Sequence, residues 1–152
     1  MQKWHLNVRI TVRDLSGNII EQVEKKNLIV NVGLNMVRDV LAGDVTDGEI
    51  KVIGIGTDAT APAVGQTQLI AEVFRKARTS DSKPAVGQYE SVWYIAPAEA
   101  VVNIREVGFF AGAAALVGTP NSGIMIARIL YSRNKTALES IQFERLDSFE
   151  EA

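Results

Sequence analysis

Residues 6–13 read LNVRITVR, a strict alternation of apolar and polar side chains. Successive side chains of a strand point to opposite faces, so the alternation predicts a strand with one buried face and one wet face. A turn-forming segment follows, in which Gly17 and Asn18 can adopt positive φ angles. A second strand, roughly Ile19 to Val30, then completes a predicted β-hairpin over residues 1–30.

The middle of the chain, residues 31–78, predicts two helices around a short strand. Asn31 can cap the first helix and Gly43 can end it. The apolar positions of this helix recur at helical spacing in Leu34, Val37 and Leu41, with Met36 and Val40 beside them. A short strand over residues 50–55 precedes the second helix, which is expected over about residues 67–77. The apolar stripe of the second helix comprises Leu69, Ile70, Val73, Phe74 and Ala77.

The C-terminal part, residues 89–149, predicts antiparallel strands, because the connections between its apolar runs are mostly short. These strands are expected at about residues 89–96, 101–110, 124–131 and 138–146. The length of 152 residues suits a single domain, residues 1–152. The predicted fold class is α+β: a mostly antiparallel β-sandwich or curled sheet with two α-helices.

Composition excludes several kinds of function. The chain is 47% hydrophobic with a formal net charge of −2, which is unlike both disordered chains and the basic domains that bind nucleic acid. We therefore expect no direct nucleic-acid partner. No apolar run approaches the roughly 20 residues of a membrane helix, so no membrane insertion is expected. The N-terminus lacks the apolar region of a signal peptide, and the absence of cysteine excludes disulfides.

Few residues suit catalysis or metal binding. His5 is the single histidine, so neither a His/Cys zinc site nor a well-placed Ser-His-Asp triad is expected, and we interpret His5 as a surface residue. The run Gly54-Ile55-Gly56-Thr57 follows a predicted strand but lacks the third glycine and the helix of a dinucleotide site, which favours a tight, close-packed turn. The sequence therefore predicts no catalytic, cofactor-binding or metal-binding residues, and no cofactor.

Glu72 and Glu106 leave two interpretations open, because each lies inside an otherwise apolar pattern. They could form the acid–base pair of a glycoside hydrolase. Alternatively, they are buried anchors, each satisfied by an arginine or by backbone donors. The second interpretation is preferred, since buried carboxylates are usually paired.

The aromatic residues also allow two interpretations. A sugar-stacking surface could be formed by Trp4, Tyr89, Trp93, Tyr94 and Tyr131. With only 7% aromatic residues in the chain, strand and core positions account for them more simply.

Several stretches, in the same order, resemble the N-terminal attachment domain of phage tail-collar and tail-fibre proteins. Two of them match the patterns T-x-L-x-x-E-x-x-R and I-x-E-V-G-F-F. The stretches are Asn27–Leu34, Ile53–Pro62, Thr67–Arg75, Ile104–Phe110 and Gly123–Arg128. The resemblance spans about residues 27–128, but the chain lacks the long shaft and receptor-binding tip of tail fibres, which favours an adaptor or tail-tip subunit.

The resemblance implies a virion structural protein of a tailed bacteriophage, located in the tail tip, baseplate or fibre-attachment region. It would be no enzyme, and would be assembled in the host cytoplasm as a homo-oligomer, a trimer or hexameric ring, in contact with other phage tail or virion proteins. Glu106 would hydrogen-bond to backbone or to Arg75, linking the second helix to the sheet. The expected subunit contacts are residues 111–123, residues 79–87 and both termini. The alternatives are a capsid decoration protein and a carbohydrate-binding host-receptor module.

Overall fold

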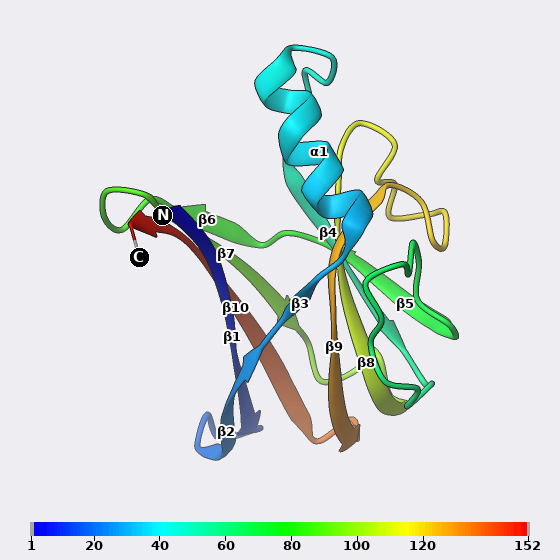
Figure 1. Ribbon diagram of the computed structural model, residues 1–152. Coiled ribbons are helices and arrows are strands. Elements are labelled where there is room, and N and C mark those ends of the chain that lie inside the picture. Colours follow the sequence, from blue (N-terminus) through cyan, green and yellow to red (C-terminus); the bar gives the residue numbers. More distant parts are fainter. Residues whose placement is uncertain (1, 152) are drawn as a thin grey trace. The chain divides into compact units, whose positions relative to one another are not determined.

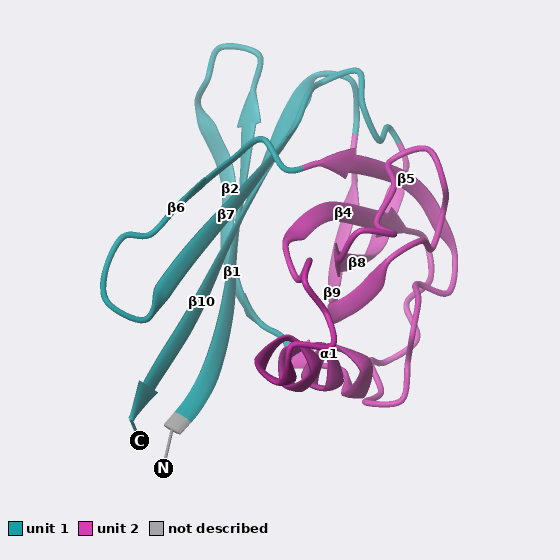
Figure 2. Cartoon of the chain, turned by 90° about the horizontal axis from the view of Figure 1, so that it is seen from above, with its two compact units in different colours: residues 1–27, 78–101, 136–152 teal, residues 28–77, 102–135 magenta. Residues whose placement is uncertain are grey.

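The computed structural model describes residues 2–151, in which ten strands and one helix are present (Figure 1). The chain divides into two compact units (Figure 2). Unit 1 comprises residues 1–27, 78–101 and 136–152, and unit 2 comprises residues 28–77 and 102–135. Five strands form one sheet within residues assigned to unit 1, and five form a second sheet within unit 2.

The sheet of unit 1 has the strand order β2-β1-β10-β7-β6, and every pairing in it is antiparallel. Its strands are β1 (Gln2–Asp14), β2 (Ile19–Lys26), β6 (Ser80–Ser82), β7 (Gln88–Ile95) and β10 (Glu139–Glu151). β1 and β2 form the N-terminal hairpin, whose turn includes Gly17 at a φ of 85°. β2 ends at Lys26, earlier than the predicted Val30, because the chain leaves this sheet after Asn27 and pairs next in unit 2.

The alternation that predicts β1 corresponds to its burial. Leu6, Val8, Ile10 and Val12 are buried, whereas Arg9 between them is exposed. β10 pairs with β1 along the whole length of both strands, and its Ile141, Phe143 and Arg145 are buried at alternate positions. The apolar side chains of β1 and β10 therefore gather on one face of the sheet, as the sequence predicts, and this face also contains the buried ion pair Arg145–Asp147.

The sheet of unit 2 has the order β3-β9-β8-β4-β5 and is also antiparallel. Its strands are β3 (Leu28–Ile29), β4 (Ile50–Gly56), β5 (Glu72–Ala77), β8 (Asn103–Ala111) and β9 (Ile124–Asn134). Its buried apolar cluster contains Val30, Val52, Leu69, Phe110, Ala115 and Met125. β7 to β10 lie where the four C-terminal strands are predicted.

The helix α1 (Asn31–Ala42) is the one helix among the described residues. It begins at Asn31, but the capping position is Val30, which makes no side-chain capping bond; the predicted Asn31 cap is therefore wrong. Gly43 ends the helix in the left-handed conformation, as predicted. The α+β, mostly antiparallel fold class is confirmed.

The second predicted helix is wrong, because residues 72–77 form strand β5. The apolar positions Val73, Phe74 and Ala77 have helical spacing, so the local pattern favours a helix over a strand. Pairing decides between them, since β5 forms an antiparallel ladder with β4 in which Arg75 lies opposite Gly54. The backbone groups of β5 thus find partners in a neighbouring strand, which no local pattern in the sequence reveals.

Gly33 brings α1 unusually close to β9. A Cβ added at this residue would lie 2.7 Å from the carbonyl oxygen of Ile126 and 2.9 Å from its Cα. We expect Gly33→Ala to lower the free energy of unfolding by about 1–3 kcal/mol, as overpacking does, although alanine is the better helix former. Gly65→Ala is the matched control, because a Cβ there meets nothing within 4 Å. Urea unfolding of both variants measures the difference; equal stability would contradict the close packing of α1 on β9.

Candidate functional site

Glu106 on β8 is fully buried and is bound by donors from two segments. Its carboxylate accepts a hydrogen bond from Arg128 Nε at 2.8 Å. It also accepts the backbone N–H groups of Ile70 at 3.1 Å and Ala71 at 2.7 Å. Arg128 on β9, likewise fully buried, donates further to the Thr60 carbonyl oxygen at 2.6 Å. This Glu106–Arg128 cluster therefore fastens both ends of the segment 57–71 to the sheet.

Asp58 belongs to the outer part of the same cluster. Hydrogen bonds from the side chain and then the backbone N–H of Thr60 are the main causes that lower the pKa of Asp58 below its ordinary value. The nearby Arg128 guanidinium, whose Nη2 lies 3.9 Å from Asp58 Oδ1, lowers this pKa further. A carboxylate that stays ionised beside a buried arginine helps to balance its charge.

Glu72 and Arg75 on β5 form a second buried ion pair, the Glu72–Arg75 cluster, with 2.7 Å between Arg75 Nε and Glu72 Oε1. The Arg75 guanidinium lies 4.2 Å from the centre of the Phe110 ring, and the other Glu72 oxygen accepts the backbone N–H of Asn121. The guanidinium also donates to the carbonyl oxygens of Leu116, Thr119 and Ser122 and to the Ser122 hydroxyl. This second cluster holds the long segment 112–123 in place.

Gly54 and Gly56 make room for the two carboxylates. A Cβ at Gly54 would collide with the Glu72 carboxylate, and a Cβ at Gly56 would collide with that of Glu106. A Cβ at Gly56 would also lie 2.7 Å from the Ala71 carbonyl oxygen. The run Gly54-Ile55-Gly56 therefore lies within and at the end of β4 as a close-packing element, rather than forming the predicted turn.

Of the two predicted partners of Glu106, backbone is confirmed, since Glu106 accepts the N–H groups of Ile70 and Ala71. Arg75 is wrong as a partner, because it pairs with Glu72 while Glu106 pairs with Arg128. The general interpretation of both carboxylates as buried anchors, satisfied by arginine and backbone donors, is confirmed. The Glu72 side chain is 1% exposed and that of Glu106 is 0% exposed. A glycosidase needs one carboxyl group at its substrate's oxygen and another beside water or the sugar, and neither of these carboxylates is open to solvent.

Arg128 is the partner that sequence reasoning missed. It stands in a strand whose neighbours Ile126, Ala127 and Ile129 are all apolar and buried. A charged residue in such a run requires a partner of opposite charge, which is the signal that could have identified it. The pairing itself depends on the register of β8 and β9, in which Glu106 lies opposite Leu130 and Gly108 opposite Arg128.

The aromatic residues do not gather into one exposed platform. Trp93 and Tyr131 are buried, which excludes them from contact with a sugar on the surface. Trp4 stacks on Phe149 at 5.5 Å between ring centres and donates its Nε1 proton to Asp147. His5, half exposed, lies 3.5 Å from Glu150 and belongs to no triad in these contacts.

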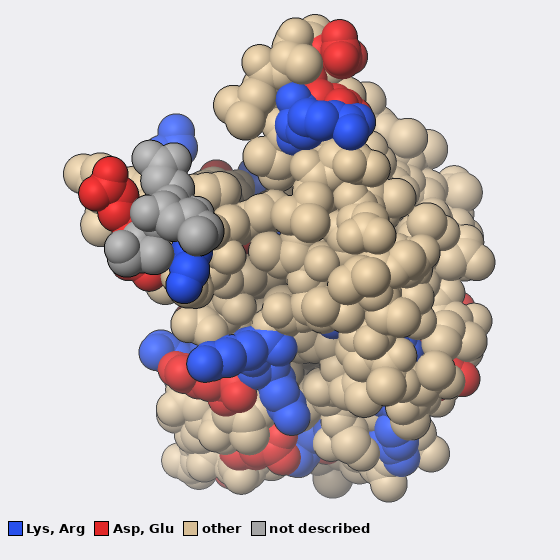
Figure 3. Space-filling model, in the orientation of Figure 1, with Lys and Arg blue, Asp and Glu red and all other residues tan. Residues whose placement is uncertain are grey.

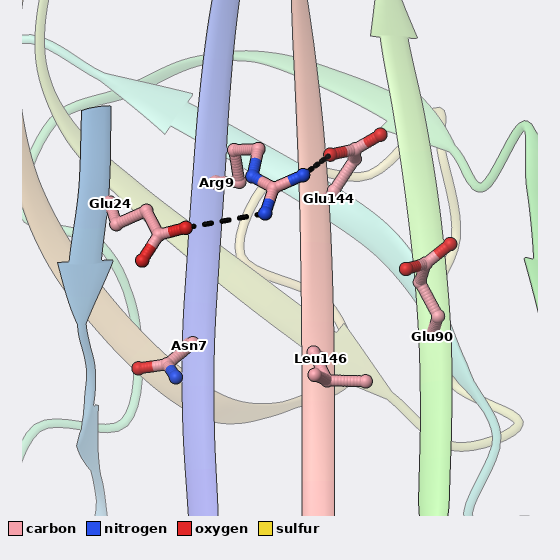
Figure 4. Close-up of a pocket in the computed structure, with 6 residues that line it drawn as sticks. All are labelled: Asn7, Arg9, Glu24, Glu90, Glu144 and Leu146. Atoms are coloured by element: carbon pink, nitrogen blue, oxygen red, sulfur yellow. Dashed lines mark hydrogen bonds and ion pairs between the residues drawn. The ribbon is translucent and has the colours of Figure 1, made fainter. Parts of the chain in front are cut away.

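A hollow of about 110 Å³ lies over the polar face of the unit 1 sheet (Figure 4). Its lining residues are Asn7, Arg9, Glu24, Glu90, Glu144 and Leu146. Arg9 reaches between Glu24 at 3.3 Å and Glu144 at 3.7 Å, and all three side chains are partly or largely exposed. Small-molecule sites usually enclose about 300 Å³ or more, so this hollow is too small for most ligands.

Within residues 2–151, no group of three or more His, Cys, Asp or Glu side chains is arranged to hold a metal ion. The helix α1 is also too short and insufficiently apolar to span a bilayer, and the described part contains no other candidate.

The outer side of α1 carries a largely exposed leucine. Leu41 is 84% exposed and Leu34 is 49% exposed, although both belong to the predicted apolar stripe. The helix is instead buried at Gly33 and Met36. Arg38, four residues after Leu34 and three before Leu41, lies on the same side and pairs with Asp39 at 2.7 Å. Figure 3 shows basic and acidic side chains together at the top of the view, where Figure 1 places α1. We call Leu34 and Leu41 the α1 apolar face.

A third ion pair, between Arg145 and Asp147 on β10, is buried in the unit 1 sheet. A second hollow, of about 340 Å³, is lined by Lys3, Trp4, Phe149, Glu150 and Glu151. A function can be argued from these features together with the two ion clusters, the α1 apolar face and the small polar hollow. Comparisons of the chain with protein-family models, with curated proteins and with solved structures find no match.

Proposed function

We propose that this chain is a virion structural protein of a tailed bacteriophage, a subunit of the tail tip, baseplate or fibre-attachment region that acts by self-assembly and protein–protein contacts. The order of the five sequence stretches that resemble tail-collar and tail-fibre attachment domains supports the phage assignment. The exposed α1 apolar face is the observation that carries the assembly role.

Leu34 and Leu41 are seven residues apart, so they lie on nearly the same side of α1, two turns from each other. Burying a leucine side chain completely contributes about 1.5–3 kcal/mol, so a partner that covers this face gains substantially. Grouped apolar side chains on a surface commonly mark sites of protein–protein contact.

The two buried ion clusters suit a scaffold. They hold segments 57–71 and 112–123 in fixed conformations through bonds to backbone groups. Segments that are already ordered lose little conformational entropy when a partner docks on them. Residues 112–123, which fall within one of the predicted subunit contacts, thus offer a preformed surface.

Sedimentation equilibrium of the purified protein tests the assembly role. We expect a homo-oligomer for the wild type and a lower mass for the double variant Leu34→Glu/Leu41→Glu, because charges on the α1 apolar face cannot be buried cheaply. Leu138→Glu is the matched control, since Leu138 is a largely exposed leucine in a turn of unit 1, outside the expected subunit contacts. A wild type that remains monomeric at every concentration, or a double variant that keeps the full mass, would contradict the proposal.

A further inference from the structure

We propose that β2 is an interface strand, which pairs in antiparallel fashion with β2 of a second copy of this chain, with Val23 on the two-fold axis. The proposal rests on the proposed self-assembly and assigns to it a specific contact. Its basis is the strand order of the unit 1 sheet, the direction of the backbone groups of β2, and the sequence of charges along this strand.

β2 is an edge strand of eight residues. β1 pairs with one side of it, and no strand in residues 2–151 pairs with the other side. The opposite edge of the same sheet is β6, which has only three residues, Ser80–Ser82. β2 therefore offers the longer open ladder of backbone donors and acceptors, a feature that favours the addition of another strand.

One backbone hydrogen bond defines which residues of β2 point outward. Asn27 donates its N–H to the Leu6 carbonyl oxygen at 3.4 Å, so Leu6 and Asn27 form a hydrogen-bonded pair. Hydrogen-bonded pairs alternate along an antiparallel ladder, so the odd-numbered residues of β2 up to its bulge bond inward to β1. The backbone groups of Gln22 and Glu24 consequently point away from the sheet.

The far side of the sheet gives the same result independently. Phe149 donates its N–H to the Gly87 carbonyl oxygen at 2.8 Å, so the odd-numbered residues of β10 bond toward β7. The even-numbered residues of β10 then bond toward β1, in the register that pairs Leu146 with Asn7. By the same alternation, β1 uses its even-numbered residues toward β2, which again leaves Gln22 and Glu24 directed outward.

Only a few registers satisfy this alternation when two copies of β2 pair. Outward residues must meet outward residues, so the two-fold axis passes through a residue of β2 rather than between two residues. With the axis at Val23, Gln22 of each copy is hydrogen-bonded to Glu24 of the other. The Val23 side chains then face each other in a non-hydrogen-bonded pair, where side chains approach most closely.

The charges select this register. With the axis at Val23, Glu21 of each copy lies directly opposite Lys25 of the other, which places two pairs of opposite charge across the interface. With the axis at Glu24, the two Glu24 carboxylates would face each other, which is unfavourable. With the axis at Gln22, neither Glu21 nor Glu24 would have an opposite charge across from it.

The same features discourage unrelated strands. Lysines at a sheet edge and an edge bulge are common protection against indiscriminate pairing, and β2 has both, with its register shift next to Val12. A second copy of β2 places an acidic residue, Glu21, opposite Lys25, whereas an unrelated strand would do so only by chance. The contact is isologous, because both copies use the same strand, so every copy is joined to one partner in this way. The assembly therefore contains an even number of copies, which favours the hexamer over the trimer.

Exchange of the charges tests the register. We expect Glu21→Lys alone and Lys25→Glu alone each to halve the mass of the assembly in sedimentation equilibrium, since each variant places like charges opposite each other. An equimolar mixture of the two variants should regain the full mass, because the first variant is basic at both exchanged positions and the second is acidic at both. The chain that carries both changes should also assemble. Single variants of full mass, or a mixture that stays dissociated, would overturn the proposal.

A cysteine at the axis gives a second, direct test. The chain contains no cysteine, so Val23→Cys introduces a single thiol that should form a disulfide with its own copy under mild oxidation. Lys26→Cys is the matched control on the same strand, where the two thiols would be about 20 Å apart. If the wild type assembles but Val23→Cys gives no more covalent dimer than Lys26→Cys, the β2 contact is wrong and the proposed self-assembly stands. If the wild type is monomeric, both are wrong.

Discussion

Arg128→Met is expected to lower the free energy of unfolding by about 3–5 kcal/mol, the usual cost of removing one partner from a buried ion pair. Methionine leaves the fully buried Glu106 carboxylate without its arginine. The Thr60 carbonyl oxygen also loses the guanidinium donor that lies 2.6 Å away. Urea unfolding, followed by circular dichroism, measures the loss of stability.

Two further variants make this test specific to the buried charge. Arg38→Met makes the same replacement on the exposed side of α1, where the ion pair with Asp39 contributes at most about 1 kcal/mol. Adding Glu106→Gln to Arg128→Met removes the unbalanced charge while the amide oxygen can still accept the N–H of Ala71. The double variant should therefore be less destabilised than the sum of the two single variants. Equal losses for Arg128→Met and Arg38→Met would contradict the assignment of Glu106 as a buried anchor.

Arg75→Met should have an effect of similar size, about 3–5 kcal/mol, for the same reason. It removes the partner of Glu72 and releases the segment 112–123 from the guanidinium that binds its carbonyl groups. We therefore expect a local signature in addition to the global loss. Amide hydrogen exchange should become faster in residues 112–123, measured by mass spectrometry under conditions where the variant remains folded.

Arg128→Met is the control that shows whether faster exchange is confined to the segment that the replaced arginine holds. Its cluster holds residues 57–71, so exchange should rise in that segment, while residues 112–123 keep their protection. The two variants should thus lower the free energy of unfolding by similar amounts but raise hydrogen exchange in different segments. If both variants raise exchange equally in both segments, the loss is general and the clusters do not act as separate anchors.

The sequence predicts those features that depend on local alternation. The apolar side chains of residues 6–13 repeat every second position, and the buried face of β1 follows them. Glu72 and Glu106 are recognisable as buried because each interrupts an apolar run, and burial of a carboxylate requires donors. These inferences need no knowledge of distant residues.

The features that depend on pairing are not predictable in this way. β5 is a strand because β4 lies beside it, although its apolar residues Val73, Phe74 and Ala77 have helical spacing. The partners of the two carboxylates follow from the registers of β4, β5, β8 and β9, which bring Arg128 to Glu106 and leave Arg75 with Glu72. The predicted link between Arg75 and Glu106 failed at this step.

The helix α1 illustrates a different limit. Its apolar positions predict a helix correctly but not the side that packs inward. Gly33 and Met36 are buried because the small glycine permits close approach to Ile126, so Leu34 and Leu41 remain outside. Periodicity alone identifies an apolar stripe, and only the packing of a backbone against a neighbour decides which side is covered.

The proposed role as a virion component is tested most directly by quantitative mass spectrometry of purified particles, produced by the genome that encodes this chain. We expect its peptides to copurify with intact virions in a fixed ratio to the major tail proteins, and to remain after washing at high salt. A chain that is synthesised during infection yet is absent from purified particles would contradict the account.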